Sequence, residues 1–335
     1  MNSPNLDLCC RRTPRHPLGA LRWRCASLAA TPRRAAWLAL AACLLAVPAA
    51  QAKLNVVVTT PDLAAIAQAV GGDRLSLTTL TKPGEDPHFV DAKPSFIVKL
   101  NRADALIEGG AELELGWLPP LVEGARNPKL APGAAGRIAA SEGIEMLEVP
   151  ATLDRSGGDL HAAGNPHFLI DPANARLAAA HLCAAFCKLD QDGSATYRAA
   201  LAEFTQRLDE RLVSWQAQLA PFRGHHVVAY HNLWPYFARR FGLAFDLFLE
   251  PKPGIPPTPA HLAEVIGRMK SDHVRVIVVE PFQNRKTAQT VAAATGAVVV
   301  NVTQYPGGVK GTEAGYLEMM DYLVGSLARA LAGGK

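Results

Sequence analysis

The chain has 335 residues, of which 49% are hydrophobic and 19% charged. This composition excludes a disordered protein and indicates a large core. The length exceeds that of one compact domain, so two lobes are expected. The net charge of +4 comes from residues 1–52, which hold seven arginines and one acid. The remainder has 27 basic and 29 acidic residues, a net charge of −2. It therefore has no basic excess that would favour nucleic-acid binding.

Residues 1–52 have the features of a secretory signal peptide. Arg33 and Arg34 precede an apolar run over residues 35–46, and the segment ends in Ala50-Gln51-Ala52, an Ala-x-Ala cleavage pattern. Residues 35–47 number only 13, whereas a membrane-spanning helix needs ~20. Cys43 offers an alternative, lipoprotein processing, which is less favoured because the apolar run continues past it. We expect cleavage after Ala52 and a periplasmic protein.

Strand and helix patterns alternate over residues 53–172. Strands are predicted at 54–60, 75–80 and 105–108, with helices at about 61–70 and 93–101. This βαβα order is typical of a mostly parallel sheet. Residues 128–164 are rich in Gly, Ala and Pro and predict loops around one short strand at 146–149. We interpret residues 53–172 as an N-terminal α/β lobe.

Two helices follow in a helical segment, residues 173–222. In the second, residues 194–219, apolar side chains recur every three or four positions, at Tyr197, Leu201, Phe204, Leu208, Leu212, Trp215 and Leu219. Such a helix is ~39 Å long and can join two lobes stiffly. Strand and helix patterns then alternate again in residues 223–335, the C-terminal α/β lobe. The predicted fold class is α/β, with two lobes that each have a mostly parallel sheet flanked by helices.

Three histidines stand in similar settings. His88 and His167 each follow a proline, and His231 directly follows a predicted strand, as does Glu280. Ligands of open α/β folds bind at the carboxyl ends of strands, and a preceding proline holds an imidazole on rigid backbone. Zn²⁺ takes four such nitrogen or oxygen ligands. The sequence therefore predicts a metal site in a cleft between the lobes, with Glu280 as candidate fourth ligand.

Other polar residues are candidates for supporting roles. Asp86, Asp91 and Asp171 could accept hydrogen bonds from the ring nitrogens that do not face the metal. His161 has two interpretations, a transient collector of metal or a residue outside the site. Cys183 and Cys187 lie four positions apart in a helical pattern. They are interpreted as buried thiols, because a regular helix does not bring such a pair into good disulfide geometry.

Several motifs together resemble the periplasmic metal-binding proteins of zinc and manganese ABC transporters, the cluster A-I substrate-binding proteins. The likeness covers about residues 54–331. It rests on Asp86-Pro87-His88, Ala103-Asp104-Ala105-Leu106-Ile107-Glu108-Gly109-Gly110 with Glu114, Asn165-Pro166-His167-Phe168-Leu169-Ile170-Asp171-Pro172, His231-Asn232-Leu233-Trp234-Pro235 and Tyr316-Leu317-Glu318-Met319-Met320. It implies two α/β lobes joined by a rigid helix, one metal between them, and delivery to a membrane permease.

The resemblance implies that His88, His167 and His231 are the first three ligands. Histidine at the third position favours zinc, since manganese binders of the family often have glutamate there, and imidazole suits zinc better. Many members carry an aspartate after the last strand, but residues 301–304 here contain no carboxylate. Either Glu280 or water therefore completes the site. The loop before the second ligand is short and holds only Asp154, Asp159 and His161.

The expected function is capture of Zn²⁺ outside the cytoplasm by a monomeric, non-enzymatic protein. It would deliver the ion to an ABC permease with its ATPase and reach the membrane only through that permease. Alternatives are a manganese-binding homologue, a zinc-dependent hydrolase with Glu280 as general base, and a surface adhesin if Cys43 is lipidated.

Overall fold

The computed structural model describes residues 53–152, 158 and 161–333. The predicted signal peptide, with Cys43 and the Ala52 cleavage site, lies outside the described residues, as do Asp154 and Asp159. Within the described ranges, no helix combines the length and apolar character needed to cross a membrane.

The first sheet has four parallel strands in the order β2-β1-β3-β4. Its strands are β1 (Leu54–Val58), β2 (Leu75–Thr79), β3 (Ala105–Glu108) and β4 (Arg137–Ala139), and its helices are α2 (Pro61–Gly71), α3 (Pro94–Asn101) and α4 (Leu118–Ala125). Val56, Val57 and Val58 are all buried, since helices cover both faces of a parallel sheet and leave no face for polar side chains.

One predicted strand of this sheet was wrong. The fourth strand is β4, where Ile138 pairs with Ile107, and not residues 146–149. That segment is a loop in which Glu148 has φ +55°. The backbone N–H of Leu147 donates to the Tyr236 hydroxyl at 3.0 Å, so a side chain satisfies a group that a strand would pair with backbone.

The second sheet repeats the topology of the first, with four parallel strands in the order β6-β5-β7-β8. Its elements are β5 (His226–Ala229), α7 (Pro235–Phe241), β6 (Ala244–Phe248), α8 (Pro259–Ser271), β7 (Val276–Val279), α9 (Arg285–Thr295) and β8 (Val298–Asn301). In each sheet the second strand lies on one side of the first strand and the third lies on the other side. The strand order therefore reverses between β1 and β3, and between β5 and β7. Crevices for ligands form at such points, at the carboxyl ends of the strands.

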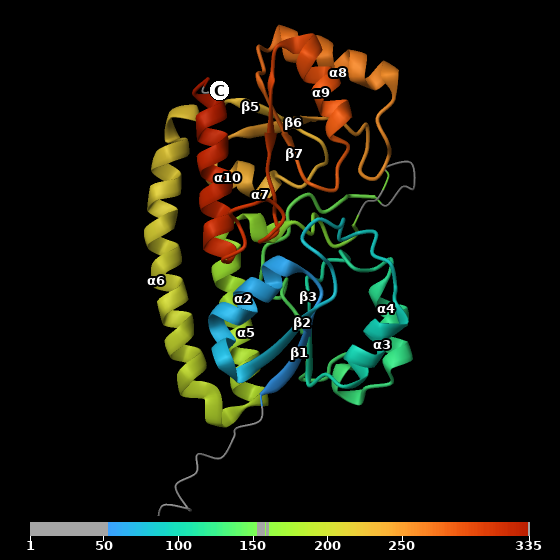
Figure 1. Ribbon diagram of the computed structural model, residues 1–335, viewed down its shortest axis with the longest axis vertical. Helices are drawn as coiled ribbons and strands as arrows, with labels where there is room; N and C mark the ends of the chain where they lie inside the picture. Colours follow the sequence, from blue (N-terminus) through green and yellow to red (C-terminus); the bar gives the residue numbers. More distant parts are fainter. Residues whose placement is uncertain (1–52, 153–157, 159–160, 334–335) are drawn as a thin grey trace, which may run out of the picture. The chain divides into compact units, whose positions relative to one another are not determined.

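Three further helices join the sheets: α5 (Pro172–Leu189), α6 (Ser194–Leu219) and α10 (Tyr316–Leu331). The 26-residue helix α6 packs against α2 and α5 beside the first sheet and against α10 beside the second, as Figure 1 shows. Tyr197, Phe204 and Trp215 of its predicted apolar stripe are buried. Trp215 also donates to Asp321 of α10 at 2.8 Å. The predicted long helix beside both sheets is confirmed.

The core explains how the two sheets are held together. One apolar cluster contains Val56 and Val58 of β1, Val227 and Ala229 of β5, and the buried stripe of α6. The opposite face of each sheet has its own cluster, beneath α3 and α4 in the first case and beneath α8 and α9 in the second. Because one core is shared, packed side chains position the strand ends of both sheets.

Candidate metal centre

His88 lies in the turn after β2 and is fixed by its neighbours. Asp86 Oδ1 accepts hydrogen bonds from the His88 backbone N–H at 3.0 Å and from its ring Nδ1 at 2.9 Å. Trp117 Nε1 donates to the Pro87 carbonyl at 2.9 Å and ties the turn to the start of α4. The ring Nδ1 of His88 is therefore engaged, and its Nε2 is left for another partner.

His167 precedes the short helix η4 (Phe168–Ile170) and is only 5% exposed. Its backbone N–H donates to Asn165 Oδ1 at 3.1 Å, and its ring Nδ1 lies 3.2 Å from Gln304 Oε1. Gln304 belongs to the loop that follows β8. A residue 137 positions away in the chain therefore orients this imidazole.

His231 follows β5 by one residue, Tyr230. Its Nδ1 lies 2.8 Å from Oε2 of Glu250, which follows β6. All three imidazoles thus bond through Nδ1 to a different oxygen acceptor, on Asp86, Gln304 or Glu250. An acceptor at Nδ1 places the ring proton there and leaves Nε2 as a bare electron pair, which is the usual arrangement in a histidine that ligates a metal.

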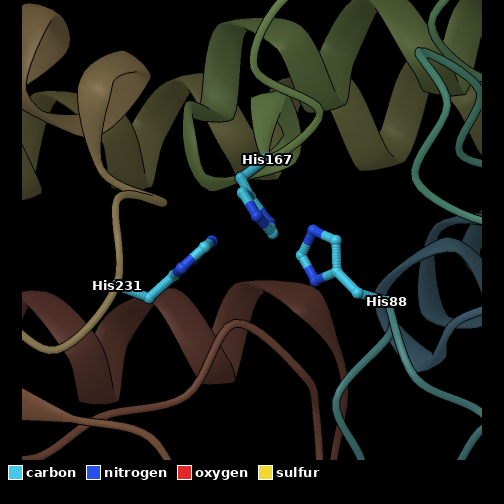
Figure 2. Close-up of side chains that lie close together, drawn as sticks. All are labelled: His88, His167 and His231. Atoms are coloured by element: carbon cyan, nitrogen blue, oxygen red, sulfur yellow. The ribbon is translucent and has the colours of Figure 1, made fainter. Parts of the chain in front are cut away.

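The three rings converge, although they come from distant parts of the chain (Figure 2). One ligand atom from each of His88, His167 and His231 lies within 4.8 Å of the other two. The ring centroids are 5.1 Å apart for His88 and His167, and 5.6 Å for each pair with His231. Nε2 of His167 is buried and, among the described residues, has no hydrogen-bond partner. This donor set fits a transition-metal ion, which would satisfy that nitrogen.

The electrostatics keep the buried ring neutral. Burial, followed by repulsion from His88 and His231, holds the pKa of His167 well below its usual value. For Asp86, burial favours a higher pKa, but the hydrogen bonds and charge of His88 outweigh it and the pKa is lowered. Asp86 is therefore an ionised acceptor, and His167 presents an unprotonated nitrogen at neutral pH.

The structure does not bring Glu280 into this group of ligand atoms. Glu280 follows β7 and is 2% exposed. Its Oε1 accepts from the Gln304 backbone N–H at 2.8 Å and its Oε2 from Gln304 Nε2 at 3.3 Å. Burial raises its pKa to about 8, against the hydrogen bonds from Gln304, which lower it. Gln304 stands between Glu280 and His167, and ligation by Glu280 stays a prediction.

The predicted supporting residues do not all contact the three histidine rings. Asp86 bonds to a histidine ring as expected, but Asp171 does not. It caps the start of α5 and forms a two-pronged ion pair with Arg240, at 2.7 and 3.0 Å. Asp91 is exposed, and within the described ranges it makes no hydrogen bond to the three rings. His161 is half-buried with its ring centroid 5.3 Å from that of His88, so it lies beside the group.

Sequence reasoning missed two of the three Nδ1 acceptors, Glu250 and Gln304. A signal for each was present. Glu250 directly follows the strand pattern of residues 245–249, and Gln304 stands two residues beyond the strand pattern of residues 298–302. Carboxyl ends of parallel strands meet at one edge, so polar residues at every strand end were candidates. Which of these residues reaches a histidine ring depends on the conformation of the loops, and the periodicity of the sequence does not predict loop conformation.

Comparison with known proteins shows the family of this chain. Residues 56–330 match the family described as zinc-uptake complex component A, periplasmic (ZnuA). The chain belongs to this family. It is 23% identical over 287 residues to the manganese ABC transporter substrate-binding lipoprotein PsaA of Streptococcus pneumoniae, covering 84% of this chain and 90% of that one.

Solved structures share the fold. A ZnuA deletion mutant with zinc bound superposes with a TM-score of 0.70 at 23% identity, covering 83% of this chain and 98% of that chain. The manganese-bound periplasmic metal-binding protein from candidatus Liberibacter asiaticus gives a TM-score of 0.68 at 20% identity, covering 83% of this chain and 99% of that chain. The family consists of substrate-binding components of metal ABC transporters, so the resemblance inferred from the motifs is confirmed.

Proposed function

We propose that this protein captures Zn²⁺ between its two sheets through His88, His167 and His231, and delivers it to an ABC permease driven by an ATPase. The leader, residues 1–52, would direct export, with cleavage after Ala52, and the carrier would act as a monomer in the periplasm. The observation that carries the proposal is the set of three convergent imidazoles, each bonded through Nδ1, with the buried Nε2 of His167 left unpaired among the described residues.

Zinc is favoured over manganese by the donor atoms. The group of ligand atoms contains three imidazoles and no carboxylate among the residues that the structure describes, whereas manganese prefers more oxygen ligands. Structural neighbours include both zinc-bound and manganese-bound proteins, so the argument rests on this chain's own residues. Zn–N distances of 2.0–2.1 Å in a tetrahedron place the nitrogens ~3.4 Å apart. Small ring movements would bring the present group to that spacing.

We propose water as the fourth ligand, because Gln304 separates Glu280 from the three rings. The same separation argues against the hydrolase alternative. A general base must reach the metal-bound water directly or through one further water, whereas the oxygens of Glu280 accept hydrogen bonds from the backbone and side chain of Gln304. Zinc here would be cargo, held until the permease takes it.

The test is a metal titration of the purified, chelator-treated protein. Elemental analysis should show one zinc per chain, and competition with a chromophoric chelator should show tighter binding of zinc than of manganese. Ester and amide substrates should not be turned over. Failure to retain zinc, or preference for manganese under the same competition, would contradict the proposal. Saturable hydrolysis that disappears in Glu280→Gln while zinc is retained would favour the enzyme.

A further inference from the structure

Glu280 has an unusual position for a carboxyl group near a cation site. It is buried directly after β7, and its side chain bonds to the loop that follows β8. Both of its oxygens accept from Gln304, through the backbone N–H and through Nε2. Its own backbone N–H donates to Gln283 Oε1 at 2.9 Å. The carboxyl is thus fixed, and its hydrogen bonds lead to Gln304.

The side chain of Gln304 connects this carboxyl to a histidine. A glutamine amide has a donor end and an acceptor end of nearly the same shape, so its neighbours decide which way it points. Both oxygens of Glu280 accept hydrogen bonds from Gln304, so the NH₂ end of the amide faces the carboxyl group. The amide oxygen then faces Nδ1 of His167 at 3.2 Å. An amide oxygen can only accept, so the ring proton is held on Nδ1.

A bound dication strengthens this arrangement. Three neutral imidazoles leave its two positive charges uncompensated, and a nearby cation favours the ionised form of a carboxyl group. Glu280 would then supply a negative charge one amide away from the ligand. In this respect the Gln304 amide extends the carboxylate–histidine–metal arrangement, in which the carboxylate sets the orientation and basicity of the ligand.

We propose that Glu280 is a positioning residue for metal capture, which acts through Gln304 to fix the tautomer of His167 and does not itself ligate the metal. The inference rests on the proposed metal site. Gln304, which lies 137 residues from His167 in the sequence, then orients its amide so that the oxygen faces Nδ1 of the buried imidazole.

The chain offers a matched control in Glu114. This carboxyl is also buried, at 4% exposure, but it accepts from the Thr59 hydroxyl at 2.6 Å and from the Gly109 N–H at 2.7 Å. These hydrogen bonds stay within the first sheet and its loops. Glu114→Gln therefore repeats the chemical change of Glu280→Gln without touching the path through Gln304 to His167.

The experiment compares the wild type, Glu280→Gln, Gln304→Ala, the double variant and Glu114→Gln. Zinc affinity is measured by competition with a chelator, and ¹⁵N NMR reports the ring tautomer of His167 in the metal-free protein at a pH above the pKa of about 8 of the Glu280 carboxyl. We expect each single variant at 280 or 304 to bind zinc about 10- to 100-fold more weakly. The double variant should be no worse than the weaker single one, because the residues act in series. Glu114→Gln should bind like the wild type.

Several outcomes would overturn the proposal. Additive losses in the double variant, or a loss in Glu280→Gln without one in Gln304→Ala, would mean that Glu280 ligates the metal directly. An unchanged His167 tautomer in both single variants would remove the relay. If Glu280→Gln does not fold by circular dichroism, Gln304→Ala and Glu280→Asp carry the same test. A wild type that fails to bind zinc would overturn the proposed function, while the tautomer readout would still test the relay.

Discussion

The two sheets have the same strand order but contribute differently to the candidate metal centre. The first part of the chain supplies His88 and His167 and one acceptor, Asp86. The second supplies His231 and two acceptors, Glu250 and Gln304. The first part of the chain thus supplies most of the candidate ligands, and the second supplies most of the acceptors that orient them. Neither part contains the complete candidate site.

The buried carboxyl groups sharpen this contrast. Glu114 accepts hydrogen bonds from the Thr59 hydroxyl after β1 and from backbone N–H groups after β3, all within the first sheet and its loops. Glu280 directly follows β7 of the second sheet, and its hydrogen bonds continue through Gln304 to His167. The hydrogen bonds of Glu114 thus stay within the first sheet and its loops, whereas those of Glu280 lead to the histidine site.

The strongest test of the ligand division is removal of one imidazole from each part. Structural zinc sites bind with about 10–16 kcal/mol over four ligands, which is roughly 2.5–4 kcal/mol per ligand. His88→Ala and His231→Ala should each weaken zinc binding roughly 100- to 1000-fold, as measured by chelator competition. Thermal unfolding of the metal-free variants should stay close to wild type. Unchanged affinity in one variant would remove that histidine from the site.

The structural role assigned to Glu114 predicts a pH effect on stability. Burial raises its pKa to about 7 from 4.5, against the hydrogen bonds from Thr59 and Gly109. The folded state therefore binds more protons than the unfolded state between these values. The stabilisation is complete below pH 4.5 and is lost as the pH rises through about 7. The difference amounts to about 3 kcal/mol.

Denaturant unfolding of wild type and Glu114→Gln on either side of this range, near pH 5 and near pH 8, would measure the effect. The variant should lose less stability than the wild type between the two conditions. An identical pH dependence in both proteins would show that Glu114 is not the responsible group.

The supporting acceptors should have smaller effects than the ligands. Glu250→Ala and Asp86→Ala remove the Nδ1 partners of His231 and His88. Each should weaken zinc binding about 10- to 100-fold, the usual effect of losing such a partner. Isothermal titration calorimetry would measure both. Asp91→Ala is the control for surface charge, since Asp91 is exposed. A larger loss in that control than in Asp86→Ala would break the assignment.

The smallest effect is expected where the two parts of the chain meet. Asn165 Nδ2 donates to the Asn232 carbonyl at 2.9 Å, and Asn232 Nδ2 donates to Glu148 Oε2 at 2.9 Å. These bonds tie the loop of His167 to the loop of His231. Asn232→Ala removes one exposed hydrogen bond, worth ~0.5–1.5 kcal/mol. Zinc affinity should fall by less than about tenfold, and an equal or larger fall than in Glu250→Ala would reverse the order proposed here.

The amino-acid sequence by itself predicted most of the fold and the three histidines that the structure brings together. Alternating apolar runs predicted parallel strands, the stripe from Tyr197 to Leu219 predicted α6, and strand ends pointed to His88 and His231. These features are local, because the spacing of apolar side chains within one segment predicts which face of that strand or helix is buried.

Only the tertiary structure decided the surroundings of the histidines. Asp171 lies four residues after His167 yet pairs with Arg240, while Gln304 lies far away in sequence and reaches the ring. Glu280 follows its strand as predicted, but Gln304 separates it from the imidazoles. Hydrogen-bond partners depend on loop conformation and on which strand ends become neighbours. Both are set by long-range packing, which the periodicity of a single segment does not contain.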